Sequence, residues 1–154
     1  MEVDVQDVTE SIFVPSERLL KRACSVCGFA LWHPVCDLEF ATLALYSDAR
    51  FPGRCILALN RHADYLEELD SSELQGFMDA VNQASRAIRE VTGCMRVNVA
   101  ILGNRDPHVH AHLIPRYGTD PLPNDAPWSD PRPKKELGQS ELKSLVEKLR
   151  RQLT

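Results

Sequence analysis

The amino-acid sequence predicts an α+β domain, in which an antiparallel sheet of about five strands packs with one long central helix and a C-terminal helix. Several short segments combine alternating apolar residues with flanking turn residues, which is typical of strands. One long segment between them repeats apolar residues at helical spacing, and residues 140–153 carry a second stripe of the same kind. Strands gathered around one long central helix indicate this class.

The first half of the chain supplies two of the predicted strands. Residues 1–14 carry little pattern and are expected to form a loose N-terminal arm, and Pro15 is expected to open a short helix that runs to about Ala23. Residues 38–46 and 54–60 are predicted strands, because apolar residues fill both and a turn with Pro-Gly separates them.

The central helix has the clearest boundaries. Asp70 followed by Glu73 is a capping signature, and Gly93 is expected to end the helix. The next predicted strand covers residues 96–102, and the segment that starts at residue 108 is expected to pair with it as a hairpin. Residues 118–135 are rich in proline and are expected to form an extended loop.

Length and composition indicate one domain with its own core, since the chain has 154 residues, of which 44% are hydrophobic and 26% charged. A net charge of −4 argues against binding to a nucleic-acid backbone. No apolar run approaches the roughly 20 residues that span a bilayer, and the acidic start of the chain does not resemble a signal peptide. A cytoplasmic protein without nucleic-acid or membrane partners is therefore expected.

Three histidines at alternate positions, His108, His110 and His112, are the most informative feature of the chain. On a strand they would point to one face, because side chains alternate between the two faces. Such a row fits two chemistries. Three imidazoles can hold a catalytic metal, and a single imidazole with a fixed ring can act as a nucleophile near neutral pH.

Cys24 and Cys27 form a Cys-x-x-Cys pair, which indicates either a metal knuckle or a redox pair. The chain has five cysteines, and an odd number fits poorly with a complete disulfide framework. The other three cysteines lie among apolar residues and are expected in the core.

The histidine row stands in the sequence HVHAHLI, followed by PRY, and an upstream segment reads FPGRCILALNRH. With the RVNVAILGN strand, these segments resemble the histidine-triad (HIT) nucleotide-binding family over residues 24–117. The LGNRDPHVH loop is similar to that of bacterial members usually described as dinucleoside-polyphosphate hydrolases. The resemblance implies a HIT-like fold.

The resemblance also implies a reaction. His110 would attack the α-phosphorus of a nucleotide, adenine being the expected base, and form a covalent nucleotidyl-histidine, while His112 would contact the phosphate. A dinucleoside polyphosphate is the favoured substrate. A nucleoside phosphoramidate, or transfer of the nucleotide to the acceptor of one pathway, is the alternative. A non-catalytic nucleotide-binding protein is the alternative of another class. The family is usually dimeric, so a homodimer is expected.

Related proteins bind zinc through a Cys-x-x-Cys pair, an upstream histidine and the first histidine of the row. By resemblance, the ligands here are Cys24, Cys27, His62 and His108. Two thiolates and two imidazoles close a tetrahedral set, so the expected zinc is structural, and no cofactor is required for the chemistry.

Four further residues are expected around the nucleotide. Asn104 is the best candidate for an amide donor to the phosphate, and the side chain of Asn98 could face the site. Asp48 corresponds to the family's acidic residue on the ribose hydroxyls. Arg54 stands where better-known branches have a histidine, and as a permanent cation it is expected to donate to phosphate or a carboxylate, or to face solvent.

Overall fold

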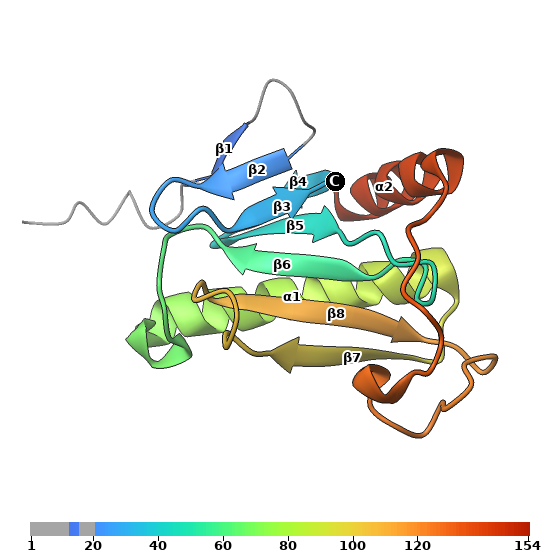
Figure 1. Cartoon of the computed structure of the whole chain (residues 1–154). Coiled ribbons are helices and arrows are strands. Elements are labelled where there is room, and N and C mark those ends of the chain that lie inside the picture. The colour runs from blue at the N-terminus through green and yellow to red at the C-terminus, as the bar shows by residue number, and fades with distance from the viewer. Residues whose placement is uncertain (1–12, 16–20) are drawn as a thin grey trace, which may run out of the picture.

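The computed structural model describes residues 13–15 and 21–154 as two sheets and two helices (Figure 1). Its strands are β1 (Phe13–Pro15), β2 (Lys21–Cys24), β3 (Ala30–Trp32), β4 (Pro34–Asp37), β5 (Ala41–Leu45), β6 (Cys55–Leu59), β7 (Arg96–Ile101) and β8 (His110–Arg116). Its helices are α1 (Ser71–Thr92) and α2 (Gln139–Leu153), with 3-10 turns η2 (Leu66–Glu68) and η3 (Pro127–Ser129). The predicted α+β class is confirmed.

The main sheet has the order β4-β5-β6-β8-β7 and is antiparallel throughout. The predicted hairpin of the histidine strand is confirmed, since β8 pairs with β7 on one side and with β6 on the other. Helix α1 covers one face of this sheet, and α2 packs against α1 and β4 (Figure 1). The second sheet, β1-β2-β3, lies over the other face near β5.

The small sheet corrects two expectations about the N-terminal region. Residues 13 and 14 belong to β1, which pairs with β2, rather than to a loose arm. Residues 21–24 form β2, where the predicted short helix should have ended, because they pair with strands on both sides. The rest of the predicted arm, residues 1–12, and residues 16–20 of that helix lie outside the described residues.

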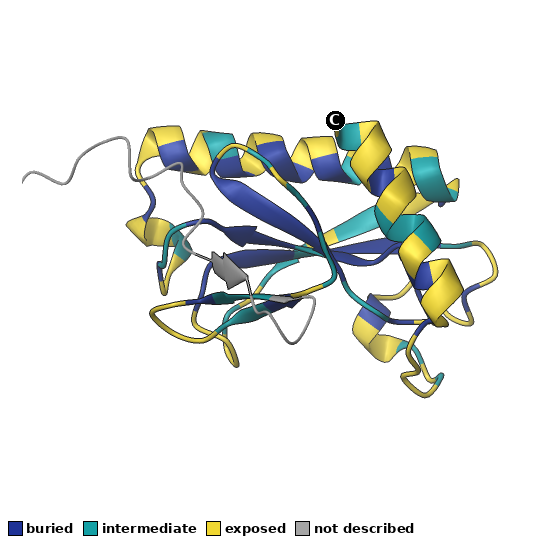
Figure 2. Ribbon diagram, turned by 90° about the horizontal axis from the view of Figure 1, so that it is seen from above, coloured by how far each residue is buried: buried dark blue, intermediate teal, exposed yellow. Residues whose placement is uncertain are grey.

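Local signals set the ends of α1 as predicted. The Asp70 side chain accepts a hydrogen bond from the Glu73 backbone amide at 2.9 Å, and Gly93 ends the helix in the left-handed conformation with φ of 67°. The inner face of the helix carries Phe77, Ala84 and Ile88, all completely buried against the sheet. Figure 2 shows this buried stripe facing the strands, so most of the stability of α1 comes from packing.

Strands β6 and β8 set the position of the histidines. Cross-strand pairing places Ile56 beside His112 and Ala58 beside His110. Ala111 and Leu113, the alternate residues of β8, are completely buried toward α1. The histidine side of β8 therefore lies on the sheet face that α1 leaves uncovered, as side-chain alternation requires.

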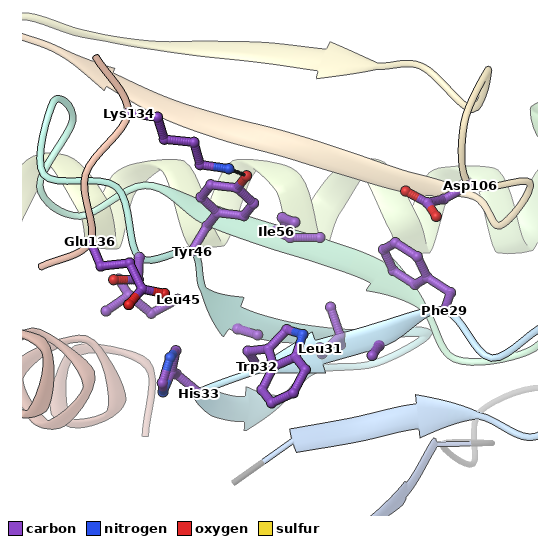
Figure 3. Close-up of a pocket in the computed structure, with 13 residues that line it drawn as sticks. Phe29, Leu31, Trp32, His33, Leu45, Tyr46, Ile56, Asp106, Lys134 and Glu136 are labelled. Atoms are coloured by element: carbon purple, nitrogen blue, oxygen red, sulfur yellow. Dashed lines mark hydrogen bonds between the residues drawn. The ribbon is translucent and has the colours of Figure 1, made fainter. Parts of the chain in front are cut away.

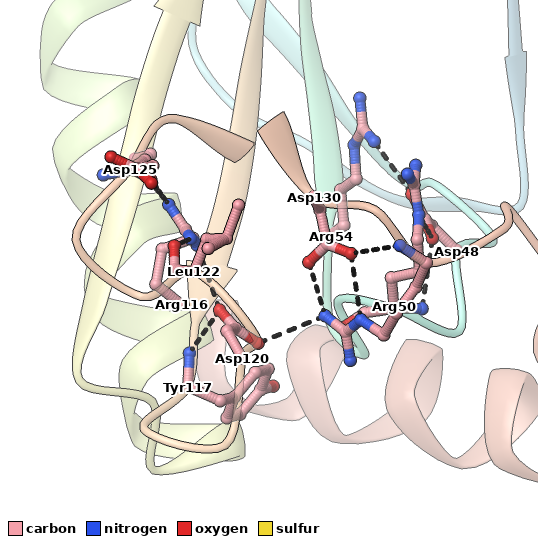
Figure 4. A network of polar contacts seen from close by, with 11 residues as sticks. Asp48, Arg50, Arg54, Arg116, Tyr117, Asp120, Leu122, Asp125 and Asp130 are labelled. Carbon is pink, nitrogen blue, oxygen red and sulfur yellow. Dashed lines mark hydrogen bonds and ion pairs between the residues drawn. The ribbon is translucent and has the colours of Figure 1, made fainter. Parts of the chain in front are cut away.

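The proline-rich segment after β8 is held on the same face by two arginines, the buried Arg116 and the half-buried Arg132. Arg116 donates to the Asp120 carboxylate at 3.0 Å and to the backbone carbonyls of Leu122 at 2.9 Å and Asp125 at 2.6 Å (Figure 4). Arg132 donates to Asp120 at 3.3 Å and to the carbonyl of Arg50 at 3.1 Å. A loop without sheet pairing is thus fixed by charged hydrogen bonds, which are stronger than neutral ones.

Among the described residues, no helix is long and apolar enough to cross a membrane.

Candidate active site and metal centre

The three histidines divide between two neighbouring sites. His108 precedes β8 and is completely buried, and its Nδ1 lies 3.5 Å from the Cys27 sulfur. His110 and His112 lie on β8 and line a cavity of about 540 Å³, the triad pocket, together with Tyr46, Arg54, Asn104 and Trp128. The alternative in which all three imidazoles hold one catalytic metal is not supported by this arrangement, because His108 turns to the cysteines.

Four side chains come together in a second cluster, the metal centre. Cys24, Cys27, His62 and His108 each offer one ligand atom, and these atoms all lie within 4.8 Å of one another. The Cys24 sulfur lies 4.0 Å from Nδ1 of His62. A tetrahedral zinc ion with bonds of about 2.3 Å to sulfur and about 2.0 Å to nitrogen needs sulfur–nitrogen separations of about 3.6 Å. The donor set and its spacing therefore fit zinc.

Both histidines of the metal centre have their second ring nitrogen engaged. Nε2 of His108 lies 2.9 Å from the carbonyl oxygen of Leu59, and Nε2 of His62 lies 2.8 Å from a carboxylate oxygen of Asp64. Each acceptor favours the tautomer with the proton on Nε2, which turns the lone pair of Nδ1 toward the thiols. Outer hydrogen bonds of this kind orient histidine ligands at metal sites.

The metal centre is connected to the triad pocket through Phe29, which lies two residues after Cys27. The Phe29 ring stacks on His108 with ring centroids 5.3 Å apart and on His110 at 4.7 Å. The sequence gives no local signal for this contact, since it joins β8 to a loop about 80 residues earlier. The cysteine knuckle thus helps to hold the ring of His110 in place.

His110 has the geometry of a fixed nucleophile. The residue is 4% exposed, and its Nδ1 lies 2.6 Å from the carbonyl oxygen of His108. A carbonyl can only accept, so the proton of the neutral ring is on Nδ1 and the lone pair is on Nε2. Because His110 lines the triad pocket, Nε2 is the ring nitrogen that is available to a ligand in this pocket.

His112 lies beside His110, with ring centroids 5.1 Å apart, and next to Trp128 at 5.9 Å. Burial, together with the neighbouring groups Arg54, His110 and Lys134, lowers the pKa of His112 to about 4. The ring is therefore neutral near pH 7 and can donate one hydrogen bond without carrying charge.

This lowered pKa has a measurable consequence for stability. The unfolded chain binds a proton at His112 below about pH 6.5, whereas the folded protein binds it only below about pH 4. We expect His112 to make folding less favourable as the pH falls from about 6.5 to about 4, and to add no further change below that range. Chemical denaturation of the wild type and of His112→Gln at pH 7 and pH 5 measures this, since the free energy of unfolding should fall more in the wild type. An equal fall in both proteins would contradict it.

The four additional predicted residues have different placements. Asn104 is exposed and lines the triad pocket, as its predicted role requires. Arg54 also lines this pocket, but its terminal nitrogens bond to Asp48 and His112 rather than facing solvent. Asn98 lies on the same sheet face but away from the pocket, because its side-chain oxygen accepts from Arg116 at 2.9 Å.

Asp48 is completely buried, and both of its carboxylate oxygens accept hydrogen bonds from Arg50, one of them also from Arg54 (Figure 4). These bonds hold the pKa of Asp48 below its ordinary value, although burial alone would raise it. The contact with ribose hydroxyls stays a prediction, and the observed partners of this carboxylate are arginines.

A second cavity of about 480 Å³, the apolar pocket, adjoins the triad pocket and shares Phe29, Tyr46 and Ile56 with it. Its walls include Leu31 and the half-exposed Trp32, and Lys134 and Glu136 lie at its edge (Figure 3). Sequence analysis missed this pocket and also Trp128. The signal for the tryptophan was its place within a proline-rich segment, where an exposed aromatic residue has no packing role of its own.

Comparison with known proteins places this geometry in a family. A model of the HIT domain matches residues 33–119, which is more than half of the chain. The chain belongs to the HIT domain family. The predicted resemblance is thereby confirmed. The histidine row lies within the matched residues, and the Cys-x-x-Cys pair lies just before them.

Solved HIT structures share this fold. A histidine triad protein of Bradyrhizobium japonicum is 27% identical with a TM-score of 0.72, and covers 79% of this chain and 90% of its own. A histidine triad protein of Marinobacter aquaeolei is 25% identical with a TM-score of 0.71, and the match covers 93% of this chain and 97% of that one. A Zn-bound histidine triad family protein of Mycobacterium smegmatis has a TM-score of 0.60 at 18% identity, covering 78% and 82% of the two chains, and shares the fold.

Among curated proteins, the asymmetrical bis(5'-nucleosyl)-tetraphosphatase of Schizosaccharomyces pombe is 31% identical over 84 residues. The match covers 51% of this chain and 46% of the yeast enzyme, so it spans about half the length of that relative.

Proposed function

We propose that this HIT protein cleaves nucleotides at the α-phosphate through a nucleotidyl intermediate on His110, with an adenine dinucleoside polyphosphate as the favoured substrate class. The observation that carries the proposal is the 2.6 Å contact between Nδ1 of His110 and the His108 carbonyl, which leaves the lone pair of Nε2 to the triad pocket. Membership of the HIT family and the partial similarity to a yeast bis(5'-nucleosyl)-tetraphosphatase support it.

In the first step, Nε2 of His110 forms a bond to the α-phosphorus while the anhydride bond to the leaving phosphate breaks. In the second step, water attacks the same phosphorus, the P–N bond breaks, and the nucleoside monophosphate is released with a proton from the water passing to solvent. His112 and Asn104, which both line the pocket, are the proposed donors to the phosphoryl oxygens, where negative charge accumulates.

The apolar pocket is the proposed position of the nucleoside. It joins the triad pocket through Phe29, Tyr46 and Ile56, so a base among its apolar walls leaves the α-phosphate next to His110. Pockets of a few hundred Å³ with apolar walls and a few polar groups are typical sites for small ligands. The base and the leaving group set the physiological substrate, and a phosphoramidate would enter the same reaction.

The metal centre is the proposed site of a structural zinc ion held by Cys24, Cys27, His62 and His108. The Mycobacterium smegmatis protein of the same fold is Zn-bound, but the proposal depends on the donor set of this chain. Four protein ligands leave no open position, so zinc would supply structural stability here, and the chain's own imidazoles would carry the chemistry.

Intact mass spectrometry after a brief incubation with diadenosine tetraphosphate tests the reaction. We expect a mass increase by one adenylate in the wild type, together with release of adenosine monophosphate. Parallel samples with a phosphoramidate of adenosine monophosphate show which leaving group is preferred. Tight binding with neither adduct nor product would favour a non-catalytic nucleotide-binding protein.

A homodimer and a cytoplasmic location stay predictions, and the first has a candidate interface. Strand β7 is an edge of the main sheet, and Val99 on it is 44% exposed. Met95 and Leu102, at either end of the strand, are exposed as well. An apolar edge strand of this kind can pair with a second copy.

We expect the wild type to sediment as a dimer and Val99→Lys to sediment as a monomer, because the lysine would place a charge in the interface. Analytical ultracentrifugation at micromolar concentration measures this. Gln152→Lys on the exposed side of α2 adds the same charge and should stay dimeric. A dimer that persists in Val99→Lys would assign the interface to another surface.

A further inference from the structure

Arg54 is the buried cation nearest to His112. Its side chain is only 6% exposed, and it lies at the turn before β6, with its guanidinium carbon 4.1 Å from the centroid of the Tyr46 ring. Burial lowers the pKa of Arg54, while Tyr46 and Asp48 act in the opposite direction. Arginine nonetheless keeps its proton in proteins, so this group is a permanent donor.

The two terminal nitrogens of Arg54 have different partners. Nη1 donates to a carboxylate oxygen of Asp48 at 2.9 Å, and Nη2 lies 3.2 Å from Nδ1 of His112. A guanidinium has no lone pair to offer, so in this contact His112 must be the acceptor. Its Nδ1 is therefore unprotonated, and the single proton of the neutral imidazole lies on Nε2.

The carboxylate behind Arg54 is itself fixed. Asp48 accepts from the backbone amide of Arg50 at 3.1 Å and from Nε of Arg50 at 3.0 Å, and the carbonyl of Arg50 accepts from Arg132 (Figure 4). The guanidinium of Arg54 is thus held between a rigid carboxylate and His112. These two contacts, one on each terminal nitrogen, set the orientation of the guanidinium.

We infer that Arg54 is a positioning residue, which fixes His112 in the tautomer with the proton on Nε2 and so aims a hydrogen-bond donor into the triad pocket. The use of this donor on a phosphoryl oxygen rests on the proposed function. The arrangement is complementary to that of His110, where the His108 carbonyl places the proton on Nδ1 and leaves Nε2 as the nucleophile. Two adjacent imidazoles thereby present opposite groups, a lone pair and a donor, to one substrate phosphate.

The ring tautomer of His112 can be measured without substrate. In nitrogen-15 NMR spectra of the zinc-loaded protein near pH 7, assigned with the help of His112→Gln, we expect a protonated Nε2 and an unprotonated Nδ1. In Arg54→Met we expect both tautomers, because no donor is left at Nδ1. Arg151→Met, which removes an exposed arginine on α2, should leave the signals of His112 unchanged.

The titratable and charged groups that act on His112 are Arg54, His110 and Lys134, and Asp48 and Tyr46 act through Arg54. Removing Arg54 should therefore raise the pKa of His112 from about 4, but not fully to its ordinary value, because burial is the largest cause of the shift. Arg54→Lys keeps the positive charge but has a single nitrogen for two partners. It should keep more of the low pKa than of the fixed tautomer, a split that a general loss of structure would not produce.

Steady-state kinetics with the proposed substrate measure the effect on catalysis, as separate changes in kcat and KM. We expect Arg54→Met to lower kcat by about 10- to 100-fold with little change in KM, since only the donor to the charge that develops during the reaction is misplaced. A wild-type His112 with its proton on Nδ1, or an Arg54→Met protein that keeps the single Nε2-protonated form, would overturn the inference. A fixed tautomer in a protein that forms no adduct would instead refute the proposed function and leave the assignment of the tautomer in place.

Discussion

Replacing His110 with alanine is expected to abolish the adenylate adduct and to lower turnover of diadenosine tetraphosphate by more than about 10³-fold. The variant has no other nitrogen in the same position. Nε2 of His112 carries a proton, because its Nδ1 accepts a hydrogen bond from Arg54, and Nδ1 of His108 faces Cys27. Intact mass spectrometry and steady-state kinetics measure the two effects.

The control for His110→Ala has to separate chemistry from folding. His110 lies under the Phe29 ring at 4.7 Å, so loss of its ring leaves a small gap and some loss of stability is expected. Gln152→Ala on α2 removes an exposed side chain and should keep full activity. An alanine variant at His110 that is folded and turns over substrate at a near-normal rate would exclude the covalent mechanism.

Replacing both Cys24 and Cys27 with serine is expected to reduce bound zinc to zero and to lower the free energy of unfolding by about 3 kcal/mol or more. The two sulfurs supply half of the ligand atoms of the metal centre, and zinc would connect the end of β2 to the segments that carry His62 and His108. Without zinc, the small sheet, whose strands are short, would no longer be connected through the metal to the segment before β8. Elemental analysis and thermal denaturation measure metal content and stability.

Cys36→Ser is the matched control, because this cysteine is half-buried and lies outside the metal centre. It should keep its zinc. The double variant should also lose activity, since the position of Phe29 over His110 depends on the same knuckle. Unchanged stability and activity after loss of both cysteines would show that these side chains form no structural metal site.

The site as a whole depends on two segments outside the main sheet. The cysteine knuckle brings Phe29 over His110, and the proline-rich segment brings Trp128 to within 5.9 Å of His112. The second segment is held by hydrogen bonds of Arg116 and Arg132. Arg132 also donates to the carbonyl of Arg50, whose side chain in turn donates to Asp48 (Figure 4). Both segments therefore restrict the rings that the proposed reaction uses.

Local patterns in the sequence were sufficient for the parts of this protein that depend on neighbouring residues. The cap of α1 at Asp70 and its end at Gly93 follow from short-range hydrogen bonds and from the freedom of glycine at positive φ. The placement of His110 and His112 on one sheet face follows from the alternation of side chains along a strand. The family resemblance added Cys24, Cys27, His62 and His108 as one ligand set, and the described structure brings them together.

The contact of Arg54 with His112 and that of Arg132 with Arg50 were decided by tertiary structure alone. Arg54 and His112 are 58 positions apart, and Arg132 and Arg50 are 82 apart, so no sequence window contains both members of either pair. The strands at residues 13–15 and 21–24 likewise depend on pairing within the small sheet rather than on their own pattern. A sequence shows which side chains can donate or accept hydrogen bonds, but only the folded structure shows which of them are in contact. The family resemblance therefore could point to His110 as the proposed nucleophile, whereas the contact that sets the tautomer of His112 appears only in the folded chain.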